Sequence, residues 1–189
     1  MKRNLAFALG LLLVLPALVA LRVLPWRHKY EVSTKTASEI VTASAGRAAV
    51  MAGMEWRLKS ITEGVPQQGA RPIPPRTKVA VAVYSVKPVT AQAVKWFDDP
   101  KAGLACPAVA VDGLGRRWKA TIRRDLVPED GQHAYGCVIV KDRDENVPLP
   151  LNQERTIRAV FVVPQDALRS LGLEVRVSTW EQGLVRLNR

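Results

Sequence analysis

Apolar residues run almost unbroken from Leu5 to Trp26, and the charged residue among them is Arg22. As a helix, this run would be about 33 Å long, which is enough to cross the ~30 Å hydrocarbon core of a bilayer. Aromatic and basic side chains gather at membrane interfaces, and the chain offers such residues at Trp26, Arg27, Lys29 and Tyr30. The pattern predicts a transmembrane anchor at residues 5–26, preceded by a cytoplasmic tail at residues 1–4.

A cleaved secretory signal is the alternative for the same run. Lys2 and Arg3 would form its charged start, and the apolar residues after them would form its core. Signal cleavage needs a small residue three positions before the cut, but a cut after Ala20 places Leu18 there. We therefore expect the anchor to be retained. No cysteine lies near the end of the run, which argues against a bacterial lipoprotein.

A stalk rich in Ser, Thr and Ala is expected at residues 27–45, turning into a first strand near residues 39–43. After it, apolar and polar residues alternate with the period of a β-strand. From Met54 to Ile61, the apolar side carries Trp56 and the other side carries charged residues. The stretch from Thr77 to Val86 is apolar on both sides, which is typical of a central strand.

A hairpin is predicted where Asp112-Gly113-Leu114-Gly115 separates two apolar runs, because glycine accepts the positive φ of a tight turn. The returning strand is expected from Arg116 to Arg123, with Trp118, Ala120 and Ile122 on its inner face. Further strands are expected at residues 135–140, 155–163 and 173–177. The segment Val89–Phe97 is expected to be an irregular crossover rather than a short helix.

Short strands separated by turn signals every ~8–12 residues indicate an all-β fold rather than an α/β fold. We predict an immunoglobulin-like β-sandwich of about seven to nine strands at residues 46–189, with Trp56 and Trp118 between its two sheets.

A family resemblance supports this interpretation. The strand Met54–Ile61, the turn around Asp112-Gly113 and the late segment Phe161–Val177 follow an amino-terminal anchor and a stalk. This arrangement resembles the immunoglobulin-like extracytoplasmic domains of unknown function in membrane proteins and lipoproteins of Gram-positive, especially actinobacterial, organisms. The resemblance implies a sandwich outside the cytoplasm, and it implies no catalytic residues.

The chain is basic, with a formal net charge of +11. Five of its Lys and Arg residues lie among the first thirty residues, which contain no acid, so 23 basic residues stand against 17 acidic ones in the rest. This excess suggests weak attraction to anionic surfaces. The residues expected to form a basic surface are Arg116, Arg117, Arg123 and Arg124.

Two cysteines, Cys106 and Cys137, are expected to form a disulfide, because an even number of cysteines in an exported domain indicates that they are paired. Two buried free thiols are the alternative. The positive charges on the two sides of the anchor are nearly balanced, so the cysteines decide the predicted orientation. We expect a single-pass protein of the cell membrane, with its amino terminus inside and its carboxy-terminal domain extracytoplasmic.

Two patterns resemble catalytic or metal-binding motifs. His133 precedes Cys137 by four residues, but it lies in a turn-like segment and is expected to be an ordinary loop histidine. Asp142-Arg-Asp144-Glu-Asn146 opens like a calcium loop, yet Val147 stands where the loop requires glycine. We therefore predict no catalytic residues, no metal site and no cofactor.

The predicted function is a non-catalytic one. We expect the sandwich to bind or brace another cell-envelope protein through its sheet edges and end loops, with no nucleic acid partner. The alternative is a basic module that binds anionic lipid or an acidic wall polymer.

Overall fold

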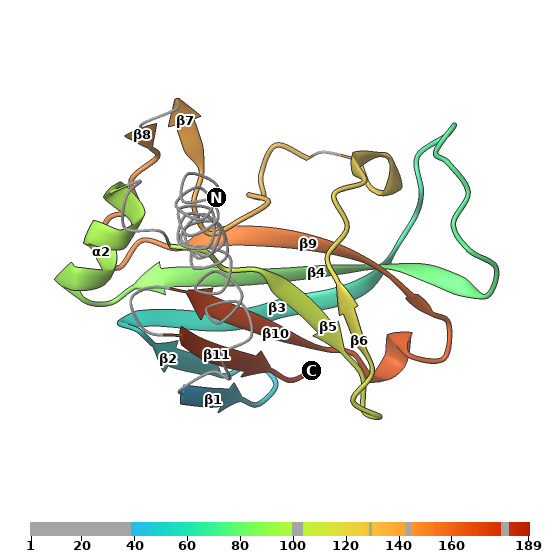
Figure 1. Cartoon of the computed structure of the whole chain (residues 1–189), viewed down its shortest axis with the longest axis horizontal. Helices are drawn as coiled ribbons and strands as arrows, with labels where there is room; N and C mark the ends of the chain where they lie inside the picture. Colours follow the sequence, from blue (N-terminus) through green and yellow to red (C-terminus); the bar gives the residue numbers. More distant parts are fainter. Residues whose placement is uncertain (1–38, 100–103, 129, 143–144, 179–181) are drawn as a thin grey trace, which may run out of the picture. The chain divides into compact units, whose positions relative to one another are not determined.

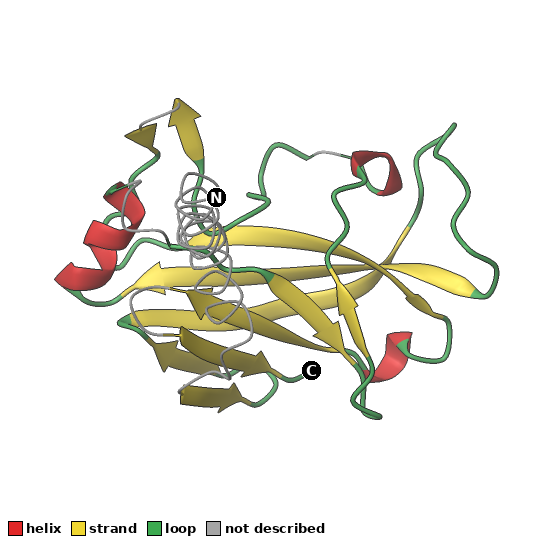
Figure 2. Ribbon diagram, in the orientation of Figure 1, coloured by secondary structure: helices red, strands yellow, loops and turns green. Residues whose placement is uncertain are grey.

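The computed structural model describes residues 39–99, 104–128, 130–142, 145–178 and 182–189, which belong to one compact unit. Its elements in chain order (Figures 1 and 2) are β1 (Glu39–Ala43), β2 (Ala48–Met51), β3 (Met54–Gly64), β4 (Thr77–Pro88), α2 (Ala91–Asp98), β5 (Ala108–Val111), β6 (Arg117–Lys119), η2 (Arg124–Leu126), β7 (Val140–Asp142), β8 (Glu145–Asn146), β9 (Arg155–Pro164), η3 (Leu168–Ser170), β10 (Gly172–Ser178) and β11 (Gln182–Leu187).

The predicted anchor at residues 5–26 lies outside the described residues, as do the tail and the expected interface residues Trp26, Arg27, Lys29 and Tyr30. Within the described ranges, no helix is long and apolar enough to cross a membrane.

Two sheets packed face to face form a β-sandwich, as predicted (Figure 1). One sheet has five strands in the order β1-β11-β10-β5-β6, and the other has four in the order β2-β3-β4-β9. Strands β7 and β8 form a separate two-stranded hairpin, so the described residues contain eleven strands instead of seven to nine. The inner faces of the two large sheets share one apolar core, which includes the fully buried Trp56.

Strand β4 lies between β3 and β9 and is buried on both faces, as its sequence predicts. Ala80, Ala82 and Tyr84 point into the main core. Val79 and Val81 point to the opposite face, where they meet Leu126 and other residues of a second, smaller apolar cluster. The segment around η2 therefore covers the outside of the four-stranded sheet.

Along one side, which we call the closed edge, the two sheets meet at β1 and β2. Strand β1 runs parallel to β11, and its neighbour across the sandwich is β2. A Cβ atom on Gly183 of β11 would collide with the sulfur of Met51 on β2 unless the Met51 side chain moved, so the two sheets pack closely there. Strand β1 belongs to the five-stranded sheet, so the described part of the sandwich begins at Glu39.

Along the other side, the open edge, the sheets end at β6 and β9. The predicted strand from Arg116 to Arg123 is wrong in its second half, because β6 ends at Lys119. From there the chain leaves its sheet and reaches the other one, where the Thr121 N–H donates to the Val160 carbonyl of β9 at 2.7 Å. Ile122, expected on an inner face, is 97% exposed.

Helix α2 corrects the expected irregular crossover at Val89–Phe97. The Thr90 side chain caps the helix by accepting from the Ala93 N–H at 3.2 Å. Ala93 and Phe97 lie four residues apart and are both buried, so the helix presents one apolar face to the domain.

Candidate functional site

The open edge contains a cleft of about 410 Å³. Residues from both sheets and from the segment that joins them line it. The apolar part consists of Tyr84, Cys106, Pro107, Ala108, Ala120, Ile122, Val127, Tyr135, Ala159 and Val160. The cationic part consists of Lys119, Arg123, Arg124 and Arg158. These residues, with Thr121, include no Asp or Glu, so the cleft combines apolar surface with positive charge.

Arg158 anchors the cleft from β9 and is only 5% exposed. Its Nη1 group donates to the Pro128 carbonyl at 2.7 Å and to Asp130 Oδ2 at 3.1 Å. Its Nη2 group donates to the Tyr135 hydroxyl at 2.7 Å, and its guanidinium also lies over the Tyr135 ring at 5.3 Å. The buried Nε of Arg158 has no partner within the described residues. Arg158 therefore holds the loop segment around residues 128–135 against the sheet.

Asp130 is the carboxylate that balances Arg158. Its Oδ1 accepts from the backbone N–H groups of Gln132 and His133, and its Oδ2 lies 2.6 Å from His133 Nδ1. Partial burial raises the pKa of Asp130, but these N–H groups, the His133 ring and the Arg158 charge outweigh burial and lower the pKa to about 2. Asp130 is therefore ionised at neutral pH.

Two exposed residues flank the cleft. Ile122 projects almost entirely into solvent, and Tyr135 is 53% exposed although its hydroxyl and ring are engaged by Arg158. Arg124 adds a second guanidinium, 5.9 Å from the centre of the Tyr135 ring. The Tyr135 ring is thus fixed by cations while much of its surface remains accessible.

Arg123, at another part of the cleft, holds the loop that precedes β4. It forms an ion pair with Asp125 at 2.6 Å and donates to the backbone carbonyls of Arg71 and Pro72. The hydrogen bonds from Arg123 are the main reason that the pKa of Asp125 lies well below its usual range. The position of the segment Thr121–Val127 is therefore set by side-chain interactions with the covering loop as well as by its hydrogen bond to β9.

The predicted disulfide between Cys106 and Cys137 is present, with a Cα–Cα distance of 5.9 Å. Cys106 precedes β5 and lines the cleft, whereas Cys137 lies in the loop before β7. The strand expected at residues 135–140 is largely absent, since β7 begins only at Val140. The disulfide thus attaches an irregular segment to the five-stranded sheet.

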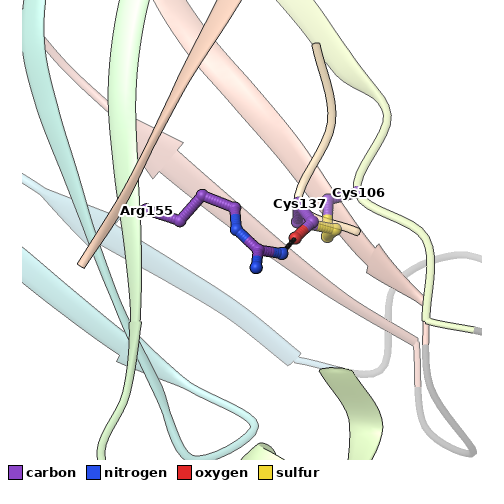
Figure 3. Close-up of a disulfide and its surroundings, with 3 residues drawn as sticks. All are labelled: Cys106, Cys137 and Arg155. Atoms are coloured by element: carbon purple, nitrogen blue, oxygen red, sulfur yellow. Dashed lines mark hydrogen bonds between the residues drawn. A yellow bond between two sulfur atoms is a disulfide. The ribbon is translucent and has the colours of Figure 1, made fainter. Parts of the chain in front are cut away.

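Arg155 supports this segment from inside the protein (Figure 3). Its Nη1 group donates to the Cys137 carbonyl at 2.7 Å, and its Nη2 group donates to the carbonyls of Val147 and Pro148. Arg155 also lies over the Phe97 ring of α2 at 5.7 Å. Burial lowers the pKa of Arg155. Its contacts join α2, the disulfide and the chain before β9, which is a structural role.

The four arginines predicted to form a basic surface are divided between two places. Arg123 and Arg124 line the cleft, whereas Arg116 and Arg117 flank the β5–β6 hairpin. Arg116 pairs with Asp112 at 2.7 Å and with Asp166 at 2.6 Å. Arg117 pairs with Glu174, which also accepts from Arg186. Most of this positive charge is therefore balanced by nearby carboxylates.

The other sequence motifs do not form a reactive site in the described residues. Cys137 is in the disulfide, and His133 lies beside Asp130. The segment resembling a calcium loop lies partly outside the described residues. Across the described ranges, no group of three or more His, Cys, Asp or Glu residues is placed to hold a metal ion.

No sequence pattern marks Lys119, Ile122, Tyr135 or Arg158 as neighbours in a cleft. One signal was available in the apolar strand β9, where Arg155 and Arg158 interrupt the apolar pattern. A buried arginine needs several acceptors, so two of them in such a strand mark a place where loops fold back onto the sheet.

Comparisons with known proteins give no family for this chain. No protein-family model matches it, and no curated protein matches its sequence. Among solved structures, an uncharacterized β-sandwich protein from Clostridium difficile 630 is 10% identical with a TM-score of 0.39, covering 82% of this chain and 99% of that chain. A conserved hypothetical protein from Bacillus anthracis is 11% identical with a TM-score of 0.45, covering 74% and 93%. The YjhA protein from Bacillus subtilis is 8% identical with a TM-score of 0.47, covering 77% and 99%.

These three proteins come from Gram-positive bacteria. At such identities and TM-scores they establish neither a family nor a function for this chain.

Proposed function

We propose that this protein is a membrane-anchored, extracytoplasmic, immunoglobulin-like module without catalytic activity, and that it binds another cell-envelope protein. The cleft at the open edge is the proposed binding site. The observation that carries the proposal is the pair Ile122 and Tyr135, two large side chains exposed beside a concave surface that brings together apolar and cationic groups. Aromatic and apolar anchors beside a pocket are typical of residues that dominate binding energy.

Strand order supports the immunoglobulin-like part of the proposal. Strands β4 and β9 pair as strands B and E do in that fold, and β11, β10 and β5 follow the order G, F and C. Strand β6 extends the second sheet as strand C′ does. The disulfide differs from the usual bridge between strands B and F, because it joins the start of β5 to a loop.

Two features support the proposed location. The apolar run at residues 5–26 is long enough to cross a bilayer. The disulfide requires an oxidising compartment, which for a bacterial protein lies outside the cytoplasm. Together they favour an anchored protein whose sandwich lies outside.

The ion pairs of Arg116, Arg117 and Arg123 favour a protein partner over a polyanionic surface. An arginine already paired with a carboxylate attracts an external anion less strongly than an isolated one does. Anionic lipid or acidic wall polymer thus remains the alternative outcome of the test below.

The test is photo-crosslinking in native membranes with p-benzoylphenylalanine in place of Ile122 in the full chain. We expect a discrete adduct with one envelope protein. The matched control carries the same residue at Leu114, which is 80% exposed at the tip of the β5–β6 hairpin, away from the cleft lining. Failure to form a protein adduct at position 122 above the level at position 114 would overturn the proposal.

A further inference from the structure

The chemistry of the cleft restricts what kind of partner segment fits it. Its lining contains four cationic residues and no acidic one. Arg158 and Arg123 are paired with Asp130 and Asp125, whose low pKa values keep them ionised. Lys119 is exposed, and no acidic partner for it is found within the described residues. The charge that remains at the cleft is therefore positive, and it favours an acidic partner.

The edge of β9 restricts the shape of that segment. Ala134 already lies beside this edge as an extended residue: its N–H donates to the Thr156 carbonyl at 2.9 Å, and its carbonyl accepts from the Arg158 N–H at 2.8 Å. Farther along, the Val160 carbonyl accepts from the Thr121 N–H. The same edge of β9 thus binds extended chain on both sides of Arg158.

Between these two contacts lie one acceptor and one donor. In an antiparallel strand, the N–H and C=O of a residue point to the same side. The Arg158 carbonyl and the Val160 N–H therefore point away from β4, and both residues line the cleft, although they are only 5% and 6% exposed. No backbone partner for these two groups is found in the described part of the chain. They match the N–H and C=O of one further extended residue.

We propose that the cleft binds an extended acidic segment of the partner protein, with one large apolar side chain that packs against Ile122 and Tyr135. One residue of this segment bonds through its backbone to the Arg158 carbonyl and the Val160 N–H, in the gap between Ala134 and Thr121, and the rest of the segment lies in the cleft. Its carboxylates lie near Lys119. This inference rests on the proposed function, because it requires a protein partner at the cleft.

The experiment extends the crosslinking at position 122 by mapping the attached peptide with mass spectrometry. We expect the mapped segment to carry net negative charge and at least one large apolar residue. Introducing Lys119→Glu should reduce the adduct about threefold to tenfold, because reversal of a rim charge replaces attraction by repulsion. Lys95→Glu is the matched control. It makes the same charge change at an exposed lysine of α2, outside the cleft, and should leave the yield unchanged.

A second measurement tests the contact with the sheet edge. A synthetic peptide of the mapped segment should slow hydrogen exchange at the Val160 amide about tenfold when it is saturating, and it should leave the Val50 amide of β2 unchanged. Circular dichroism of each variant establishes that the sandwich is intact.

The outcomes separate this inference from the proposed function. A protein adduct with a neutral or basic segment would overturn the inference and leave the proposed function standing. The same conclusion follows if Lys119→Glu reduces the yield no more than Lys95→Glu does, or if Val160 exchange is unaffected. An adduct with lipid or polymer, or no specific adduct, would overturn both.

Discussion

The two sheets of this sandwich are joined differently at its closed edge and at its open edge. At the closed edge, β1 and β2 bring the sheets so close that the Met51 side chain fills the space beside Gly183. At the open edge, the sheets end at different places, and the chain after β6 is held there by the Arg123–Asp125 ion pair, the Arg158 contacts and the disulfide at Cys137. The first edge is closed by contacts between β1 and β2, whereas the second retains a cleft. A binding site is therefore expected where polar and covalent links replace close packing.

The largest difference in the free energy of unfolding should appear between the alanine variants of Trp56 and Trp118. Trp56 is fully buried in the core, so Trp56→Ala should lower the free energy of unfolding by about 3–5 kcal/mol. Trp118 lies on β6 at the open edge, is half-buried and packs beneath Arg116. Trp118→Ala should cost about 1–2 kcal/mol. Urea denaturation of both variants measures this contrast, and equal losses would contradict it.

Removing the disulfide should affect the open edge selectively. In the chain-entropy model, a bridge between residues 31 positions apart contributes about 3–4 kcal/mol to the free energy of unfolding. The double variant Cys106→Ala with Cys137→Ala should lose about that much. Native-state hydrogen exchange should show faster opening at Ala134 and Arg158 than at Val185 of β11. A uniform increase at both edges would argue against separate local stability.

The two edges should also differ in their response to acid. Because the pKa of Asp130 is lowered to about 2 in the folded state, its contribution to stability is present above its unfolded pKa of about 4 and is lost as the pH falls from about 4 to 2. The thermal midpoint of the wild type should therefore fall over this window. Asp130→Asn should make the fall shallower and lower the midpoint at pH 7. A pH profile parallel to that of the wild type would show that Asp130 does not contribute.

The smallest effect on stability is expected for Ile122→Ser. A side chain that is 97% exposed contributes little to folding, so the free energy of unfolding should stay within about 0.5 kcal/mol of the wild type. The variant should nevertheless lose co-purification of the partner captured at this position. A folded variant that retains the partner fully would remove Ile122 from the proposed site.

The sequence predicted the structure best in strands that are regularly hydrogen-bonded to their neighbours. Alternation predicted β3 and the burial of Trp56, and the run of apolar residues on both sides predicted the central position of β4. Asp112-Gly113 predicted the β5–β6 hairpin. In each case the period of side chains along the strand is the same as the period of burial in the sheet.

Sequence patterns failed where the chain leaves a sheet. The alternation of apolar and polar residues continues through Ala120 and Ile122, although β6 ends at Lys119. The alternation does not depend on which backbone groups are hydrogen-bonded, so it cannot mark the end of the strand. The helix α2 was missed although Thr90, Ala93 and Phe97 carry a cap and a four-residue apolar spacing. The even cysteine count predicted the bridge, but its place beside the cleft depends on contacts between distant segments.

The parallel pairing of β1 with β11 has a consequence for how the protein matures. Glu39 lies opposite Gly183 and Ala43 lies opposite Leu187, so β1 can pair only after β11 has been synthesised. Contacts between such distant residues slow folding. In a chain that emerges from the ribosome, or passes through an export channel, β1 would therefore stay unpaired until β11 has also emerged, and a chaperone could bind β1 during that interval.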